Sequence, residues 1–216
     1  MKETLEVLNR MQADGIIGGY AIGGAVGATL YLEPSATLDV DVFVTLPPAR
    51  LDCTPIHEYL TARGGEVQGE HIVVGGWPVQ FRVPSDNLER EALAYSIEVD
   101  VEDGWARVMT PEHLVALALK SGRPEDFSRI LQFVEQDAVD MDLLKRIVSS
   151  HGVERKWQKF RQRYLGGVRS NSPTSRRKEL AKLPFSEKLK ILAKLRDRSL
   201  AIAGARRKKA EAKRKG

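Results

Sequence analysis

Hydrophobic and polar residues alternate in two different ways along this chain. Before Thr110, short apolar runs of strand length are interrupted by glycine pairs and turn residues, whereas after Thr110 the apolar positions recur every three or four residues. The first pattern is typical of strands interleaved with helices, and the second is typical of amphipathic helices. The order predicts an α/β unit over residues 1–109 followed by a helical subdomain over residues 110–168.

The first unit divides into short elements. Gly75-Gly76 and Asp103-Gly104 are expected to form tight turns between strands. The predicted helices cover residues 4–14, a small-residue stretch ending near 32, 55–63 and 87–95, and the predicted strands cover 19–22, 37–45, 66–74, 78–83, 97–101 and 106–109.

The second unit begins with a clear helix start. Thr110, Pro111 and Glu112 supply a capping hydroxyl, a proline in the first turn and an acid near the positive end of the helix dipole. A linker is predicted at Gly166-Gly167 and 170–175, and Ser186 is expected to cap a last helix. The predicted helices cover 111–121, 124–136, 140–150 and 153–165, and the apolar stripe of the last helix is Leu189, Leu192, Leu195 and Ile202.

Composition places the chain among ordinary globular proteins. It is 42% hydrophobic and 29% charged, and it has no apolar run approaching the roughly 20 residues that span a bilayer. Cys53 is the only cysteine, so no internal disulfide can form, and the first residues lack the apolar core of a secretory leader. We therefore expect a cytoplasmic protein with no membrane partner.

Charge divides the chain more sharply than the net value of +5 suggests. Residues 170–216 contain 16 Lys and Arg against 4 Asp and Glu, a net of +12, and the other 18 basic and 25 acidic residues leave 1–169 at −7. A basic helical tail over 169–216 could bind RNA phosphates, fold back on the acidic body, or remain a solvated segment.

The most distinctive acidic pattern is Thr37-Leu38-Asp39-Val40-Asp41-Val42. On a strand, Thr37, Asp39 and Asp41 share one face, and the apolar residues between them share the other. Two carboxylates on one face repel each other and are costly to desolvate, a cost that Mg²⁺ or Mn²⁺ would remove. Alternatively, both acids simply face solvent, and an Asp-x-Asp pair considered alone favours that interpretation.

A glycine pair upstream changes the interpretation of those acids. Gly23 and Gly24 lie between a predicted strand and a helix start, where backbone N–H groups can approach a phosphate. Followed by a short helix and then Thr-x-Asp-x-Asp, this arrangement resembles the signature of the DNA polymerase β-like nucleotidyltransferase superfamily. The resemblance implies a mixed-sheet α+β fold, Gly23 and Gly24 on nucleotide phosphates beside Thr37, and Asp39 and Asp41 as the catalytic metal ligands.

A second stretch, Thr110 to Asp126, is similar to a helical motif of small nucleotidyltransferases associated with toxin–antitoxin and abortive-infection operons. The resemblance implies an NTP substrate, an RNA acceptor such as tRNA, and a toxin-like role. Lys120 and Arg123 would then assist phosphate binding, although both could merely solvate a helix end. The tail, over 176–205, would resemble a small helical antitoxin-like partner fused to the chain, docked on its own body.

One position departs from the superfamily pattern. The resemblance implies a third carboxylate on the strand 78–83, where this chain has Gln80, and an amide cannot act as a general base. Glu70, His71 and Asp86 are conceivable substitutes. The sequence therefore leaves open a metal-dependent nucleotidyltransferase, a non-catalytic binding module of the same fold, and an antibiotic-modifying transferase.

Overall fold

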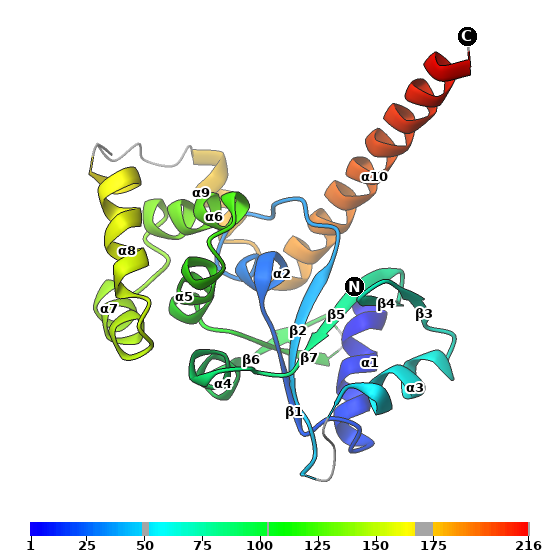
Figure 1. Cartoon of the computed structure of the whole chain (residues 1–216), viewed down its shortest axis with the longest axis horizontal. Coiled ribbons are helices and arrows are strands. Elements are labelled where there is room, and N and C mark those ends of the chain that lie inside the picture. The colour runs from blue at the N-terminus through cyan, green and yellow to red at the C-terminus, as the bar shows by residue number, and fades with distance from the viewer. Residues whose placement is uncertain (49–51, 103, 167–174, 216) are drawn as a thin grey trace.

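The computed structural model of the protein describes residues 1–48, 52–102, 104–166 and 175–215. Most of the predicted linker, residues 167–174, lies outside these ranges. Within them, Figure 1 shows a twisted sheet at the centre, helices on both of its faces, and a long C-terminal helix that projects away from the body. The predicted α+β fold, a mixed sheet with flanking helices followed by a helical subdomain, is confirmed.

The central sheet contains seven strands in the order β3-β4-β5-β2-β1-β7-β6 across the described residues. Strand β2 lies near the middle, antiparallel to β1 and parallel to β5, so the sheet is mixed. The bounds are β1 Gly19–Ile22, β2 Val40–Thr45, β3 Glu66–Gln68, β4 His71–Val74, β5 Trp77–Arg82, β6 Ile97–Val101 and β7 Gly104–Val108.

The two faces of β2 belong to two different cores. Val40, Val42 and Val44 are fully buried and pack with α1 (Lys2–Ala13) and α3 (Thr54–Thr61). Phe43 points to the opposite face, where α2 (Gly24–Ala28) and α4 (Asn87–Ala94) cover the sheet. Because side chains alternate along a strand, Asp41 projects on the Phe43 side, toward the helical half of the molecule.

The helical half extends the second core away from the sheet. Its helices are α5 (Pro111–Ser121), α6 (Pro124–Glu135), α7 (Met141–Ser150) and α8 (Glu154–Phe160), which continues as the π-helical turn η1 (Arg161–Leu165). Phe133, Trp157 and Phe160 are buried between them. In Figure 1 these helices form a lobe to the left of the sheet, which we call the helical lobe.

The C-terminal region is helical but only its first part is packed. Helix α9 (Ser175–Ala181) was not predicted, and α10 (Phe185–Lys215) begins one residue before Ser186, which therefore lies inside the helix. Phe185, Leu189 and Leu192 belong to the same core as the sheet. Farther along, α10 leaves the body, and Ile202 is 46% exposed, so the predicted apolar stripe is not buried over its whole length.

Two predicted strands differ from the structure in their bounds. The stretch 66–74, predicted as one strand, is a hairpin of β3 and β4, because Gly69 adopts a left-handed φ of 63° and turns the chain. The strand predicted from Thr37 begins at Val40, and Leu38 is 53% exposed. Within the described ranges, no helix has the length and apolar character needed to cross a membrane.

Candidate functional site

The glycine corner between β1 and α2 lies directly against Asp41. The backbone N–H of Gly23 donates to the Asp41 carbonyl at 3.0 Å. Gly24 has a φ of +56°, and a Cβ atom there would lie 2.1 Å from the Asp41 Oδ2 atom. Any larger residue would therefore collide with the carboxylate, so glycine is required here for conformation and for space.

Asp39 and Asp41 act electrostatically on each other. Burial, followed by the negative charge of Asp39, raises the pKa of the Asp41 carboxyl above its ordinary value. The Asp39 side chain is 45% exposed and that of Asp41 28%. Thr37 Oγ1 lies 3.2 Å from Asp39 Oδ1 and can donate to it. The structure therefore brings Thr37, Asp39 and Asp41 together beside Gly23 and Gly24.

These donors suit a hard divalent cation that binds together with a nucleotide. Mg²⁺ is usually held by one or two carboxylates, with waters and substrate phosphates completing its shell. Among the residues that the structure describes, no group of three His, Cys, Asp or Glu side chains could hold a metal by itself. Burial and the charge of Asp39 together outweigh the nearby arginines and raise the pKa of Asp41. Its side chain is still 28% exposed, so a cation can reach the pair.

Strand β5 carries neutral and cationic side chains beside Asp41. Gln80 is the register partner of Asp41 in the parallel β2–β5 pair. The Gln80 Nε2 atom donates to Glu70 Oε2 at 3.0 Å. Arg82 Nη1 lies 3.9 Å from Asp41 Oδ1, and its guanidinium is 5.3 Å from the centroid of the Phe43 ring. The strand next to the acidic pair thus offers an amide and an arginine where a carboxylate was expected.

Two of the conceivable substitutes lie at this site and one does not. The β3–β4 turn places Glu70 beside the Gln80 amide. The same turn brings His71 Nε2 to 3.5 Å from Asp39 Oδ2. The His71 Nε2 atom is buried without a hydrogen bond. Asp86 belongs to a separate cluster around Lys120. The turn at Gly69, which was missed in the sequence, is what brings Glu70 and His71 to this position.

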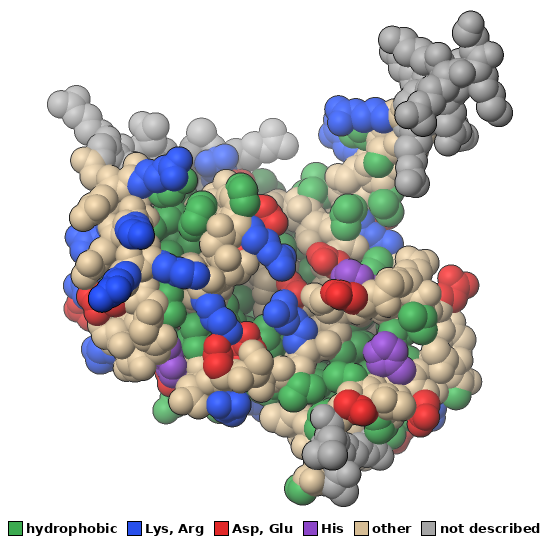
Figure 2. Space-filling model, in the orientation of Figure 1, with side chains coloured by type: hydrophobic (Ala, Val, Ile, Leu, Met, Phe, Trp, Pro, Cys, Tyr) green, Lys and Arg blue, Asp and Glu red, His purple; other side chains and the backbone are tan. Residues whose placement is uncertain are grey.

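Two arginines of the helical lobe act electrostatically on Asp41. The positive charges of Arg123 and Arg129 both lower the pKa of Asp41, opposing burial and Asp39. Arg123 is the residue before α6, and Arg129 is held on α6 by Asp126, with its Nη1 atom 2.9 Å from Asp126 Oδ1. Figure 2 shows lysine and arginine side chains gathered over this side of the helical lobe. The sequence offered no signal for the direction of Arg129.

Lys120 is engaged elsewhere. Its Nζ atom lies 2.5 Å from Asp86 Oδ2 and 2.6 Å from Glu89 Oε1, and it joins α5 to α4. Burial alone would raise the pKa of each of these carboxyls, but the hydrogen bond and charge of Lys120, together with hydrogen bonds from backbone N–H groups, outweigh burial and lower both. The ammonium is thus already matched by two carboxylates, and its predicted role in phosphate binding stays a prediction.

The chain resembles solved structures in architecture. An antigenic nucleotidyltransferase-like protein from Paracoccidioides brasiliensis superposes with a TM-score of 0.56 at 15% identity, over 76% of this chain and 90% of that one. The fold is that of a nucleotidyltransferase-like protein. No protein-family model matches the sequence, and no curated protein matches it.

Two structures of the antibiotic-resistance factor ANT(2")-Ia are also similar, with weaker superposition. The one in complex with adenylyl-2"-tobramycin has a TM-score of 0.40 at 16% identity, covering 76% of this chain and 99% of that one. The solution structure has a TM-score of 0.38 at 17% identity, covering 76% and 94%. The nucleotidyltransferase-like fold places β2, the glycine corner and the helical lobe in one framework, and the functional assignment rests on the side chains within it.

Proposed function

We propose that the protein transfers a nucleoside monophosphate from an NTP to an acceptor hydroxyl in a metal-dependent reaction. The observation that supports this most directly is the Asp39–Asp41 pair, incompletely neutralised and pressed against a glycine corner that admits no Cβ. Two carboxylates this close together, one of them largely buried, destabilise their charged forms, and such groups are concentrated at functional sites.

Each group around the pair has a role in this proposal. Asp39 and Asp41 would hold Mg²⁺ or Mn²⁺, which when bound supplies charge neutralisation for the triphosphate. The backbone of Gly23 and Gly24 allows close approach of a phosphate. Arg123 and Arg129 present planar guanidinium groups from the helical lobe, which suit bidentate contacts with phosphate oxygens.

The acceptor hydroxyl also requires a proton acceptor. Gln80 cannot take a proton, and Arg82 adds positive charge beside Asp41. General-base catalysis contributes about 10²–10⁴-fold in typical enzymes, so we propose a slow transferase. The Glu70 carboxylate accepts from the Gln80 amide at 3.0 Å, and it is the substitute proton acceptor that we propose.

The test is label transfer from each α-phosphate-labelled NTP, with Mg²⁺ or Mn²⁺, to RNA, to protein and to aminoglycosides. Asp39→Asn and Asp41→Asn should abolish transfer. Asp142→Asn is the matched control, because the Asp142 carboxylate is 79% exposed on α7 and pairs only with Lys145 among the described contacts of its side chain. Transfer that survives both site substitutions would remove the proposal.

The second candidate is a non-catalytic binding module of the same fold, and the neutral Gln80 and cationic Arg82 on β5 favour it. It predicts nucleotide binding without transfer under every condition above. A toxin-like role is proposed from the sequence resemblance alone. It predicts growth arrest on expression that Asp41→Asn relieves, and no arrest by the native chain removes it.

The tail, proposed as an antitoxin-like partner, would act within the same chain. The first turns of α10 place Phe185, Leu189 and Leu192 in the core that β2 shares with α1 and α3. Lys188 Nζ donates to the Leu30 carbonyl at 2.8 Å, and Arg177 pairs with Glu33 at 2.9 Å. Both contacts fall on the segment that leads from the glycine corner to Asp39, so we propose that the tail supports this segment.

A further inference from the structure

A row of cations follows the outer face of the helical lobe. Arg155, Lys159 and Arg163 recur every four residues along α8 and η1, so they lie on roughly one side, and Lys156 is adjacent to them. All four are exposed, whereas Trp157 and Phe160 on the other side are buried in the core. We call Arg155, Lys156, Lys159 and Arg163 the basic row.

The basic row lacks negative partners within the described part of the chain. No described carboxylate lies within ion-pair distance of Arg155, Lys159 or Arg163. Like charges four residues apart destabilise a helix slightly. Their contacts inside the protein are to other groups, since Lys156 Nζ donates to the Lys120 carbonyl at 2.5 Å and the Arg163 guanidinium lies 5.3 Å from the Tyr164 ring.

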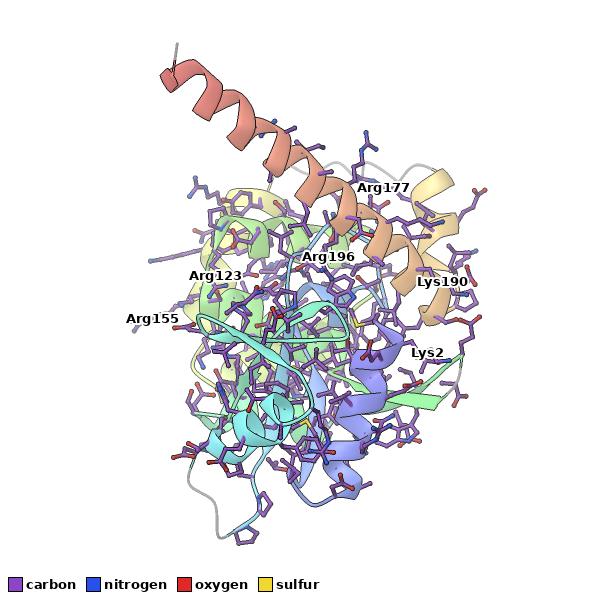
Figure 3. All side chains as sticks on the ribbon, turned by 90° about the vertical axis from the view of Figure 1, so that its right-hand side faces the viewer. Lys2, Arg123, Arg155, Arg177, Lys190 and Arg196 are labelled. Carbon is purple, nitrogen blue, oxygen red and sulfur yellow. The ribbon has the colours of Figure 1, made fainter. Side chains whose placement is uncertain are left out.

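The basic row is connected to the arginines that face Asp41 by direct packing. The Phe127 ring, at the start of α6, packs at a tilt against Phe160 and Tyr164, with ring centroids 5.9 and 5.7 Å apart. Helix α6 starts just after Arg123 and carries Arg129, and these are the two arginines of the lobe whose charges act on Asp41. Figure 3 shows Arg123 and Arg155 on the same side of the molecule, with Lys2, Arg177 and Lys190 toward the other side.

We propose that the basic row binds the phosphate backbone of RNA, and that RNA is thereby presented to the Asp39–Asp41 site as the acceptor. The second part rests on the proposed nucleotidyl transfer, but the binding itself does not. From Arg155 to Arg163 the helix rises roughly 12 Å, enough to follow more than one phosphate. The Tyr164 ring packs on Phe127 and Phe160, so it fixes this end of the row against the core. A regular line of cations along one helix fits the repeating phosphates of a nucleic acid better than an acidic peptide.

The test measures binding of a fluorescent RNA hairpin with a single-stranded overhang, by anisotropy at several salt concentrations, without NTP or divalent metal. The first variant is Arg155→Gln/Lys159→Gln/Arg163→Gln. The matched control is Lys2→Gln/Arg177→Gln/Lys190→Gln, which removes the same number of charges from the other side of the molecule. Circular dichroism verifies that both variants are folded.

The first variant should weaken RNA binding by about tenfold or more and lower the slope of log affinity against log salt by about 2, since each single-stranded phosphate contact contributes about 0.7. The control should leave that slope unchanged. Equal losses in the two variants would show that only net charge matters and would overturn the proposal. A second result would also overturn the proposal. If RNA binding survives in the first variant but disappears when the chain is truncated after Arg206, the site lies at the basic end of α10.

Failure of the proposed transfer reaction gives a different pattern. If the protein binds RNA through the basic row but transfers no label, the binding surface stands and the nucleotidyl transfer does not. The transfer reaction is supported if Asp41→Asn abolishes transfer and leaves RNA affinity unchanged. The role of the basic row in presenting RNA is supported if the basic-row variant lowers transfer to RNA at subsaturating RNA. Transfer to RNA that is insensitive to the basic row would contradict the role of this surface in presenting the acceptor.

Discussion

Two acidic pairs on the helical side of the sheet differ in how their charge is compensated. Asp86 and Glu89 share Lys120, whose ammonium lies 2.5 and 2.6 Å from them, and both have a lowered pKa despite burial. For Asp39 and Asp41 the contacts are longer, with Arg82 Nη1 3.9 Å from Asp41 and His71 Nε2 3.5 Å from Asp39. Burial, followed by the charge of Asp39, raises the pKa of Asp41. One pair shares a close ammonium, and the other has only these longer contacts.

This difference separates a structural cluster from a candidate chemical site. A carboxylate pair with its own lysine gains little from an added cation, while a pair with only longer cationic contacts beside a glycine corner is suited to bind one. We therefore expect substitutions in the Lys120 cluster to change stability and substitutions in the Asp39–Asp41 site to change activity.

The largest effect is expected for Asp41→Asn. Nucleotidyl transfer should fall on the order of 10³-fold, since a charge that organises the transition state is lost. The melting temperature should stay equal or rise, because the substitution removes repulsion with Asp39. Transfer rates and thermal melts measure the two parts. A variant that loses stability instead of activity would place this pair among the structural clusters.

Gly24→Ala should lower transfer by about 10²-fold, because misplacement near 1 Å is enough for a loss of this size. The new Cβ would lie 2.1 Å from Asp41 Oδ2 and must displace the carboxylate. Gly15→Ala is the matched control. Gly15 has a similar φ of +68° and nothing within 4 Å of the added atom, so it carries the backbone strain alone. Equal losses of activity in the two variants would contradict the role of the Asp41 contact.

Lys120→Met should lower the free energy of unfolding by about 2 kcal/mol, which is less than the ~3–5 kcal/mol for a fully buried pair because Lys120 is partly exposed. Lys145→Met, which breaks an exposed pair with Asp142, should stay within about 0.5 kcal/mol. Urea denaturation measures both. If Lys120→Met keeps its stability and instead raises the KM for NTP, Lys120 is a phosphate ligand after all.

Gln80→Glu should raise the transfer rate by about tenfold, since it places a carboxylate in register with Asp41 and restores a possible proton acceptor. Gln68→Glu on the exposed strand β3 is the control for the added charge. Single-turnover rates at saturating NTP and metal give the comparison. A fall in rate with nucleotide binding intact would mean that the base is not what this site lacks.

The smallest effect concerns Lys188, which is 1% exposed on α10. Burial lowers the pKa of its ammonium from 10.5 to about 8. Between pH 8 and pH 10.5 this lysine is protonated in the unfolded chain more than in the folded one, so its contribution to the free energy of unfolding becomes more favourable as the pH rises. Lys188→Met should therefore raise the free energy of unfolding by about 1 kcal/mol at pH 7, and this advantage should shrink as the pH rises from 8 to 10. Lys190→Met should instead lower the free energy of unfolding slightly, because Lys190 is exposed and its contacts with Glu102 and Glu187 raise its pKa.

The sequence was sufficient for elements with local signals. Helix α5 occupies the predicted residues 111–121, because Thr110-Pro111-Glu112 starts it and the left-handed Gly122 ends it. The period of two around Asp39 and Asp41 placed the buried face of β2 correctly from Val40 onward. Gln80 lies on the strand next to β2, as the superfamily resemblance implied, and the structure adds that it is in register with Asp41.

The sequence patterns could not predict contacts between residues that are far apart along the chain. Lys120 finds Asp86 and Glu89 on another helix, and no spacing within the sequence distinguishes this from phosphate binding. The Gly69 turn was hidden because the residues around it continue a strand-like pattern. Arg129 shows only a local pair with Asp126, and its direction toward Asp41 depends on how α6 packs.

The most direct test is a crystal of the protein grown with Mn²⁺ and a non-hydrolysable NTP analogue, with data collected to locate manganese by anomalous scattering. The proposed function predicts a manganese peak between the Asp39 and Asp41 carboxylates, bonded also to phosphate oxygens of the nucleotide. A bound nucleotide with no metal at these two residues, or manganese at Asp86 and Glu89 instead, would contradict it.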